Sequence, residues 1–304
     1  MEAKENYIKK LNECNIAYEF EKMYQLIKDL INSGVSIKEI DDLCPNLPVY
    51  RIINNIISYG KDNETTTKAI IDYYNDNYIN QDRCIIVSDN HMGRLMYGEK
   101  DTISCHHENE RGIHFAYEHA YKHGIKNIIH LGDLIEGHSQ TNRMRIKDNN
   151  HQLEYLRRYY PNYPDIKTYL LYGNHDFNFI YWYIDNPRFY KLCTNMELIG
   201  VNYSYINFCG YPIKLSHEST VSNYLKNLDL PYDFELSGHS HTYKFFEDQR
   251  LIKVPCLSSA STDGETVGFL EMINEEKEFL FKFYDQNDNE IPQNEKVLRK
   301  NTNN

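Results

Sequence analysis

The spacing of apolar residues divides the chain into a helical first part and a strand-rich second part. Over residues 18–60, apolar side chains recur every three to four positions, as in the segment 20–31, and this spacing is typical of amphipathic helices. Ser36 is placed to cap a second, shorter helix, and Pro48 to open a third. We therefore expect a small all-α domain over residues 1–60.

The order of these helices resembles a helix-turn-helix domain, in which the third helix enters the major groove of DNA. That helix offers only Arg51, Asn54 and Asn55 to bases, and residues 1–60 carry seven Lys and Arg against nine Asp and Glu. DNA affinity depends largely on positive charge that neutralises phosphates. We therefore favour the alternative, a small helical bundle used for docking or dimerisation, and leave DNA contact open.

Residues 61–82 are expected to form a linker with a short helix, after which the apolar pattern changes. From Cys84 onward, short runs rich in β-branched residues alternate with helical segments. Three of these runs end in polar loops: residues 84–87, 127–131 and 166–171. The alternation predicts a mostly parallel sheet covered by helices, with the polar loops at one edge. Beyond residue 196 the helical pattern stops, and the remaining short segments predict a second, mixed sheet facing the first.

The predicted fold class is α/β with the character of a β-sandwich. Two mixed β-sheets pack together and are flanked by helices, with polar loops at the strand ends, and the small N-terminal all-α domain is added to them. We assign the main domain to residues 83–285 and a polar, frayed C-terminal tail to residues 286–304.

Composition narrows the possible classes of function. The chain has 304 residues, of which 41% are hydrophobic and 25% charged, as in ordinary globular proteins. Its formal net charge of -11 argues against a broad basic face for nucleic acid. The seven cysteines contain no CxxC pair, which predicts reduced thiols. We see neither a signal-peptide pattern nor an apolar run of about 18 residues, so we expect a cytoplasmic protein without membrane contact.

Polar side chains suited to metal binding cluster at the predicted strand ends. They are Asp89 and His91; Asp133; Asn174, His175 and Asp176; His217; and His239 and His241. Carboxylates, imidazoles and an amide oxygen suit a pair of Mn, Fe or Zn ions. One carboxylate can bridge two ions held about 3.5 to 4 Å apart. No Cys lies in these clusters, which disfavours a structural zinc site. Histidines outside them, such as His130, are expected to be solvated loop residues.

The order of these motifs resembles the calcineurin-like metallophosphoesterases over roughly residues 84–275. The motifs are DxHxG at 89–93, GDxxE at 132–136, GNHD at 173–176, the lone His217, and GHSH at 238–241. The resemblance implies hydrolysis of phosphate esters with two divalent cations, for which Mn is favoured and Fe or Zn are alternatives. The chain departs from the family pattern at Glu218, where the family often has Gly.

The resemblance also implies a role for each site residue. Asp89, His91 and His241 would bind the first metal, Asp133 would bridge, and Asn174, His217 and His239 would hold the second. In the family, the residue equivalent to His175 faces the scissile phosphate and assists the leaving group, and Asp176 would orient its ring. Gly173 is expected to permit the turn that carries these residues.

We predict a metal-dependent phosphohydrolase, and a phosphodiesterase in preference to a phosphomonoesterase. The fused helical domain could present a nucleic-acid or nucleotide substrate, although the acidic balance weakens that inference. A phosphomonoesterase or protein phosphatase is the alternative within the enzyme class. A DNA-binding or scaffold protein that uses the phosphoesterase domain as a sensor is the alternative outside it. Aromatic residues such as Phe177 and Phe179 could stack a nucleobase, but their spacing favours the core face of a helix.

Overall fold

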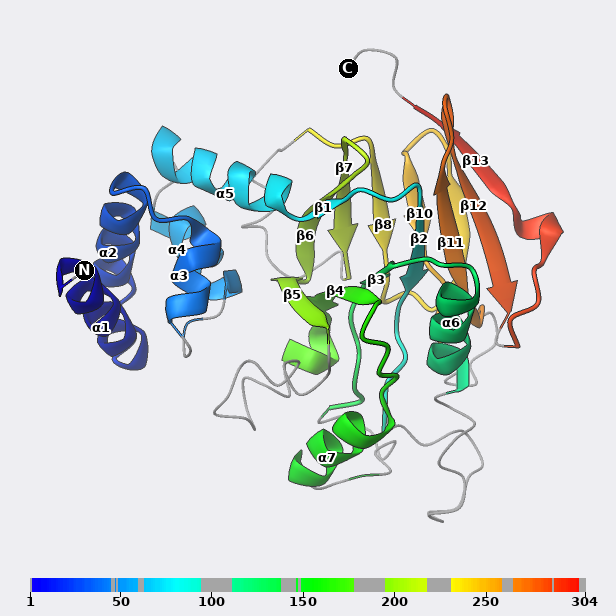
Figure 1. The fold of residues 1–304 in the computed structure, drawn as a ribbon, viewed down its shortest axis with the longest axis horizontal. Helices are drawn as coiled ribbons and strands as arrows, with labels where there is room; N and C mark the ends of the chain where they lie inside the picture. Colours follow the sequence, from blue (N-terminus) through cyan, green and yellow to red (C-terminus); the bar gives the residue numbers. More distant parts are fainter. Residues whose placement is uncertain are drawn as a thin grey trace.

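The computed structural model shows a helical unit beside a larger unit built on β-sheet (Figure 1). It describes residues 2–44, 47, 49–59, 63–93, 111–137, 146, 149–177, 195–217, 231–258, 265–285 and 287–300. Among these residues, none of the helices has the length and apolar character needed to cross a bilayer.

Five helices make up the helical unit. They are α1 (Glu2–Ile16), α2 (Phe20–Asn32), α3 (Ile37–Leu43), α4 (Val49–Tyr59) and α5 (Glu64–Asp76). Ser36 caps α3 by accepting a hydrogen bond from the backbone N–H of Glu39, and Asn63 caps α5 in the same way. Apolar faces of all five helices bury side chains such as Ile27 and Ile70 in one core. The segment expected as a linker with a short helix therefore contributes a 13-residue helix to this unit.

Two of the three side chains considered for base contact are engaged inside the helical unit. The Arg51 guanidinium donates to Asn15 Oδ1 at 3.2 Å. Asn55 is buried, and its amide donates to the carbonyl of Phe20 at 2.8 Å. These contacts hold α4 against the first two helices. The interpretation of these helices as a helix-turn-helix domain stays a prediction.

The strands form one continuous path that folds into two packed sheets. They are β1 (Tyr78–Ile79), β2 (Arg83–Val87), β3 (Asn127–His130), β4 (Lys167–Tyr172), β5 (Met196–Val201), β6 (Tyr203–Phe208), β7 (Tyr211–Ser216), β8 (Phe234–Ser237), β9 (Lys244–Phe246), β10 (Leu251–Lys253), β11 (Gly268–Asn274), β12 (Glu278–Asp285) and β13 (Lys296–Arg299). The order is β13-β12-β11-β2-β3-β4-β5-β6-β7-β8-β10-β9, with β1 paired to β6. Strands β2 to β5 are parallel, while β11 adds to β2 in antiparallel fashion. Because β5 and β6 pair at a single position, Val201 with Tyr203, the path divides there into a first sheet (β13 to β5) and a second sheet (β6 to β9).

The central strands of the first sheet are buried on both faces. In β2, Cys84 and Ile86 face the core between the two sheets, whereas Ile85 and Val87 face the helices α6 (Arg111–Lys122) and α7 (Asn149–Tyr159). Burial on both faces explains why these strands are continuous apolar runs rather than alternating ones. Two mixed sheets flanked by helices confirm the predicted fold class.

The helical unit packs against the junction of the two sheets. Helix α4 contacts β5, and α5 contacts β6. The ring centroids of Tyr74 and Tyr205 lie 5.2 Å apart, and Lys38 Nζ lies 3.4 Å from a Glu197 carboxylate oxygen. Aromatic packing and an ion pair therefore join the two units.

The expectation of a frayed tail is wrong for residues 287–300. A short 3-10 helix, η4 (Pro292–Asn294), precedes β13, which pairs antiparallel with β12. Leu298 of β13 is buried in the core between the sheets. A four-residue strand with one core side chain gives little periodic signal, so pairing with β12 decides its structure.

Candidate metal centre

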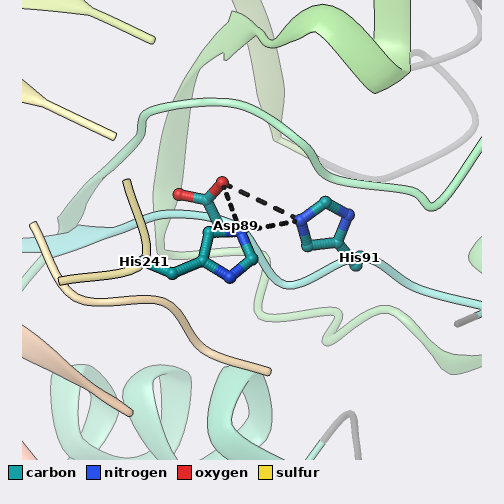
Figure 2. Close-up of side chains that lie close together, drawn as sticks. All are labelled: Asp89, His91 and His241. Atoms are coloured by element: carbon teal, nitrogen blue, oxygen red, sulfur yellow. Dashed lines mark hydrogen bonds and ion pairs between the residues drawn. The ribbon is translucent and has the colours of Figure 1, made fainter. Parts of the chain in front are cut away.

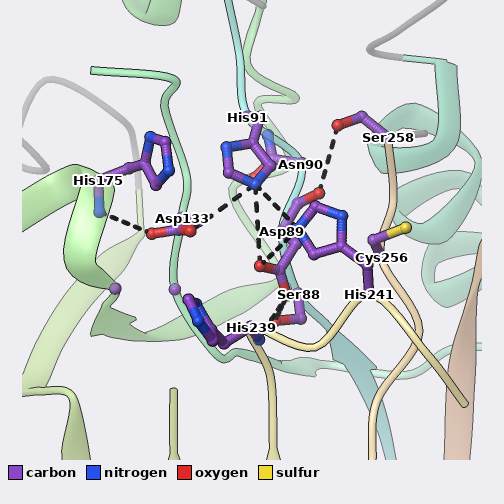
Figure 3. A network of polar contacts seen from close by, with 12 residues as sticks. Ser88, Asp89, Asn90, His91, Asp133, His175, His239, His241, Cys256 and Ser258 are labelled. Atoms are coloured by element: carbon purple, nitrogen blue, oxygen red, sulfur yellow. Dashed lines mark hydrogen bonds and ion pairs between the residues drawn. The ribbon is translucent and has the colours of Figure 1, made fainter. Parts of the chain in front are cut away.

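The strand order brings all five polar clusters to one place. The clusters carrying Asp89, Asp133 and Asn174 follow β2, β3 and β4, which are parallel neighbours and end at the same edge of the first sheet. His217 follows β7 and His239 follows β8, a parallel pair in the second sheet. Figure 3 shows side chains from both sheets pointing toward one another.

Asp89, His91 and His241 form the first donor group, here called the Asp89 position (Figure 2). His91 Nε2 lies 3.2 Å from His241 Nε2, and Asp89 Oδ1 lies 3.3 Å from His241 Nε2 and 3.8 Å from His91 Nε2. Donor atoms bound tetrahedrally at 2.0 to 2.1 Å from one ion lie about 3.3 Å apart. The spacing of the three donor atoms therefore fits a shared cation.

Neighbouring groups orient these donors. Asp89 Oδ2 accepts hydrogen bonds from the Ser88 hydroxyl and from the backbone N–H of His239 at 2.9 Å, so Oδ1 faces the imidazoles. His241 Nδ1 lies 3.1 Å from Glu265 Oε1, which directs Nε2 toward Asp89. The preferred ligand nitrogen of His241 is thus Nε2.

Asp133, Asn174, His217 and His239 surround a second position, here called the Asn174 position. His217 Nε2 lies 3.1 Å from both Asp133 Oδ2 and Asn174 Oδ1, and its Nδ1 donates to the Leu131 carbonyl at 2.6 Å. The ring of His239, which is exposed, lies 5.2 Å from that of His217 between centroids. Asp133 Oδ2 also lies 3.7 Å from His91 Nε2, so this carboxylate stands between the two positions.

Buried carboxylates raise the pKa of two imidazoles of the site. Burial alone would lower the pKa of His217, but the Asp133 carboxylate raises it to about 9. Burial likewise opposes protonation of His241, yet Asp89 and Cys256 raise its pKa to about 11. These protonated nitrogens lie where a bound cation would supply positive charge in place of the proton.

Five site residues adopt left-handed backbone conformations. They are Asp89, His91, Asp133, His239 and His241, with φ between 43° and 67°. Such conformations cost roughly 1–2 kcal/mol each for residues other than glycine, and they cluster at functional sites. Backbone hydrogen bonds from Asp89 N–H to the Gly132 carbonyl and from His91 N–H to the Asp133 carbonyl, both 2.9 Å, hold two of these loops together.

Gly173 is required for space rather than for its backbone angles. A Cβ atom at Gly173 would collide with Asp133 and approach His217 Nε2 to 2.7 Å. Gly132 is similar, because its Cβ would lie 2.7 Å from His217 Nδ1, and its φ of +104° is also left-handed. Glycine is therefore needed at position 173 because a side chain would not fit there, and not because the turn needs glycine backbone angles, as we expected.

The structure corrects the role expected for Asp176. Its carboxylate accepts hydrogen bonds from the backbone N–H groups of Gly173, Leu134 and Ile135, at 2.9 to 3.2 Å. The ring of His175 is instead held by Glu136, whose backbone carbonyl lies 2.6 Å from His175 Nδ1. Asp176 thus ties the third loop to the second through these three backbone hydrogen bonds.

Three further residues take part in the site. Glu136 belongs to the GDxxE motif, so the sequence contained a signal for it, whereas Glu265 lies in no motif. His130 was expected to be solvated but is fully buried. It accepts from the Gly132 N–H at 3.1 Å and contacts Asn90 Oδ1 at 2.7 Å, and burial lowers its pKa to about 3. It therefore stays neutral and links the first two loops.

The aromatic residues after the GNHD motif are only partly within the described residues. Phe177 packs against the core beneath the helices, which supports the core interpretation. Phe179 lies outside the described residues, as does Glu218.

Comparison with known proteins gives remote likenesses only. No protein-family model and no curated protein sequence matches the chain. Similar solved structures include Yfce, a phosphoesterase from E. coli, with 13% identity, a TM-score of 0.43, and coverage of 72% of this chain and 100% of that one. Vps29 complexed with zinc, from Entamoeba histolytica, has 14% identity, a TM-score of 0.35, and coverage of 71% of this chain and 97% of that one. Nuclease MPE from Pseudomonas putida has 16% identity, a TM-score of 0.34, and coverage of 63% of this chain and 84% of that one. At these values the likeness carries no residue role or activity over to this chain.

Proposed function

We propose that this chain is a metal-dependent phosphoesterase acting on phosphodiesters. The observation that supports it most is the place of Asp133 Oδ2, which lies 3.1 Å from His217 Nε2 and 3.7 Å from His91 Nε2. A carboxylate between two groups of imidazole and oxygen donors is the arrangement that holds a pair of divalent cations. The Asp89 position would hold one cation and the Asn174 position the other, with Asp133 shared.

The donor set accepts Mn²⁺, Fe and Zn alike, and we propose Mn²⁺ as the working choice. Such cations, when bound, supply an activated water and polarise the phosphoryl oxygens. Asp89 and Asp133 provide the negative charge that retains them, because both carboxylates are buried and held ionised: despite burial, the neighbouring histidines keep the pKa of each well below its usual range.

His175 is proposed as the group that protonates the leaving oxygen. Its side chain is 22% exposed, whereas His91 beside it is 1% exposed, so His175 lies on the open side of the site. Its Nδ1 donates to the Glu136 carbonyl, which leaves Nε2 as the nitrogen that can carry a transferable proton. A positioned general acid contributes about 10² to 10⁴-fold to a rate.

A His175→Ala substitution tests this role. We expect it to lower turnover of an alkyl phosphodiester by about 10² to 10⁴-fold, and turnover of a bis-aryl phosphate far less, because an activated leaving group needs no proton. Equilibrium dialysis should still find two Mn²⁺ per chain. His123→Ala, at an exposed position in the turn that follows α6, is the control and should behave as the wild type. Equal losses on both substrates would contradict the acid role.

The preference for diesters rests on the helical unit fused to the sheets, which could present a nucleotide or nucleic-acid substrate. Turnover of bis-aryl and mono-aryl phosphates with Mn²⁺ separates the alternatives. A strong preference for the monoester would assign the chain to the phosphomonoesterases instead. Loss of both activities in Asp133→Asn would exclude a contaminating enzyme. We do not favour the sensor or DNA-binding alternative, because Arg51 and Asn55 are engaged within the helical unit.

A further inference from the structure

Two buried glutamates lie behind the imidazoles of the Asp89 position. His91 Nδ1 lies 3.0 Å from Glu136 Oε2, and His241 Nδ1 lies 3.1 Å from Glu265 Oε1. The side chains of Glu136 and Glu265 are only 1% and 8% exposed. Solvent therefore screens these carboxylates little, and their charges act on the imidazoles they face.

The Asn174 position has a different surrounding. His217 Nδ1 donates to the Leu131 carbonyl at 2.6 Å, a partner without formal charge. The imidazole of His239 is exposed, and Asn174 would contribute a neutral amide oxygen. The Asp89 position thus has three carboxylates around it besides the shared Asp133, whereas the Asn174 position depends on Asp133 for its negative charge.

We infer that Glu136 and Glu265 are positioning residues that make the Asp89 position the tighter of the two cation positions. The inference rests on the proposed function. A carboxylate that accepts the far N–H of a ligand imidazole, as Glu265 does from His241, fixes the ring and raises the basicity of the ligating nitrogen. Glu136 lies 3.0 Å from His91 Nδ1 as an ion-pair partner and acts on that ring through its charge. Loss of such a partner typically costs about 10 to 100-fold in metal affinity. The first cation added should therefore occupy the Asp89 position.

The same carboxylates also favour protonation of the imidazoles, but the cation gains more from them. A divalent ion carries twice the charge of a proton, so its Coulomb interaction with Glu136 and Glu265 is about twice as strong at equal distance. The added negative charge should therefore favour the cation even where a proton must leave.

The test is a titration of the full-length, metal-free chain with Mn²⁺ alone, followed by calorimetry or equilibrium dialysis. We expect two binding steps. Glu265→Gln keeps the side-chain shape and removes the charge, so it should weaken the tighter step by about 10 to 100-fold and leave the weaker step unchanged. Glu265→Asp should recover part of the loss. Glu276→Gln removes the same charge from an exposed position and should change neither step.

Two ligand variants assign the steps: His241→Ala should remove the tighter one and Asn174→Ala the weaker one. Glu136→Gln should act like Glu265→Gln, and if it fails to fold, Glu265→Gln decides. Two steps of equal affinity, or a Glu265→Gln variant that shifts neither step or only the weaker one, would overturn this inference alone. A wild-type chain that binds no divalent cation would overturn the proposed function together with it.

Discussion

Cation binding should release protons from this site. In the metal-free chain the pKa of His217 is raised to about 9 and that of His241 to about 11, so both imidazoles are protonated at pH 7. Because Nδ1 of His217 donates to Leu131 and Nδ1 of His241 faces Glu265, the additional proton sits on Nε2 in each ring. That nitrogen is the one placed to bind a cation. Ligation requires it unprotonated, so about two protons should leave when both positions fill at pH 7.

The size of the effect follows from the raised pKa values. At pH 7, competition from a proton with a pKa of about 9 lowers the apparent affinity for the cation by about 10²-fold, and competition from one with a pKa of about 11 lowers it by about 10⁴-fold. A histidine with a raised pKa keeps its additional proton at pH values below that pKa and loses it at pH values above. Cation affinity should therefore weaken in acid and rise by about tenfold per pH unit for each displaced proton.

Calorimetric titration with Mn²⁺ at pH 7, in buffers of different ionisation enthalpy, measures this release. The slope of the observed enthalpy against the buffer enthalpy gives the number of protons, and we expect about two for the wild type. His217→Ala should lower the number by about one, since one protonated ligand is removed. A slope near zero, or an affinity for Mn²⁺ that does not change between about pH 6 and 8, would refute the reasoning.

Three other substitutions test further features. Gly173→Ala should weaken Mn²⁺ binding by at least about tenfold in dialysis, since the new Cβ meets His217 Nε2; wild-type affinity would show that the loop gives way. Asp176→Asn should slow the hydrolysis of alkyl and aryl phosphodiesters by the same factor, because Asp176 accepts hydrogen bonds from backbone N–H groups. A selective loss of turnover on the alkyl ester would instead support a role for Asp176 in orienting His175. Glu271→Gln should lower the free energy of unfolding by about 3 kcal/mol at pH 7 in urea titrations. Despite burial, His119 and Arg83 lower the pKa of Glu271 from 4.5 to about 2, so its contribution is present at neutral pH and disappears as the pH falls from 4.5 to 2. An unchanged free energy of unfolding for Glu271→Gln at pH 7 would contradict this contribution.

Much of the fold follows from local sequence signals. The strands β2, β3 and β4 are apolar runs because both their faces are buried, and the polar residues after them meet because parallel neighbours end at one edge. The start of α5 was harder to predict, since Thr65, Thr66 and Thr67 have modest helix propensity and the helix depends on the Asn63 cap and the shared core.

The donor residues of the site could be predicted from the sequence, but the residues that orient them through hydrogen bonds could not. Asp89 and His241 belong to motifs, whereas Glu265 reaches His241 only because of how the chain crosses between the two sheets. His130 was misjudged because a histidine at a strand end usually meets solvent, and here the two loops close over it. Asp176 was assigned to the nearest ring in sequence, while its hydrogen bonds go to three backbone groups.

The place of β11 in the first sheet has a consequence for synthesis of the chain. Its residues 270–273 pair with residues 83–86 of β2, although 184 to 190 residues separate the paired positions along the sequence. Until β11 has been made, the β2 edge that bears the fully buried Ile85 and Ile86 remains open, and unpaired strand edges promote aggregation. A ribosome that stalls before Gly268 would therefore release a chain with Asp89, Asp133 and His241 all present but with its central strand unprotected. Such fragments are natural clients for chaperones, even though every proposed metal ligand has already been synthesised.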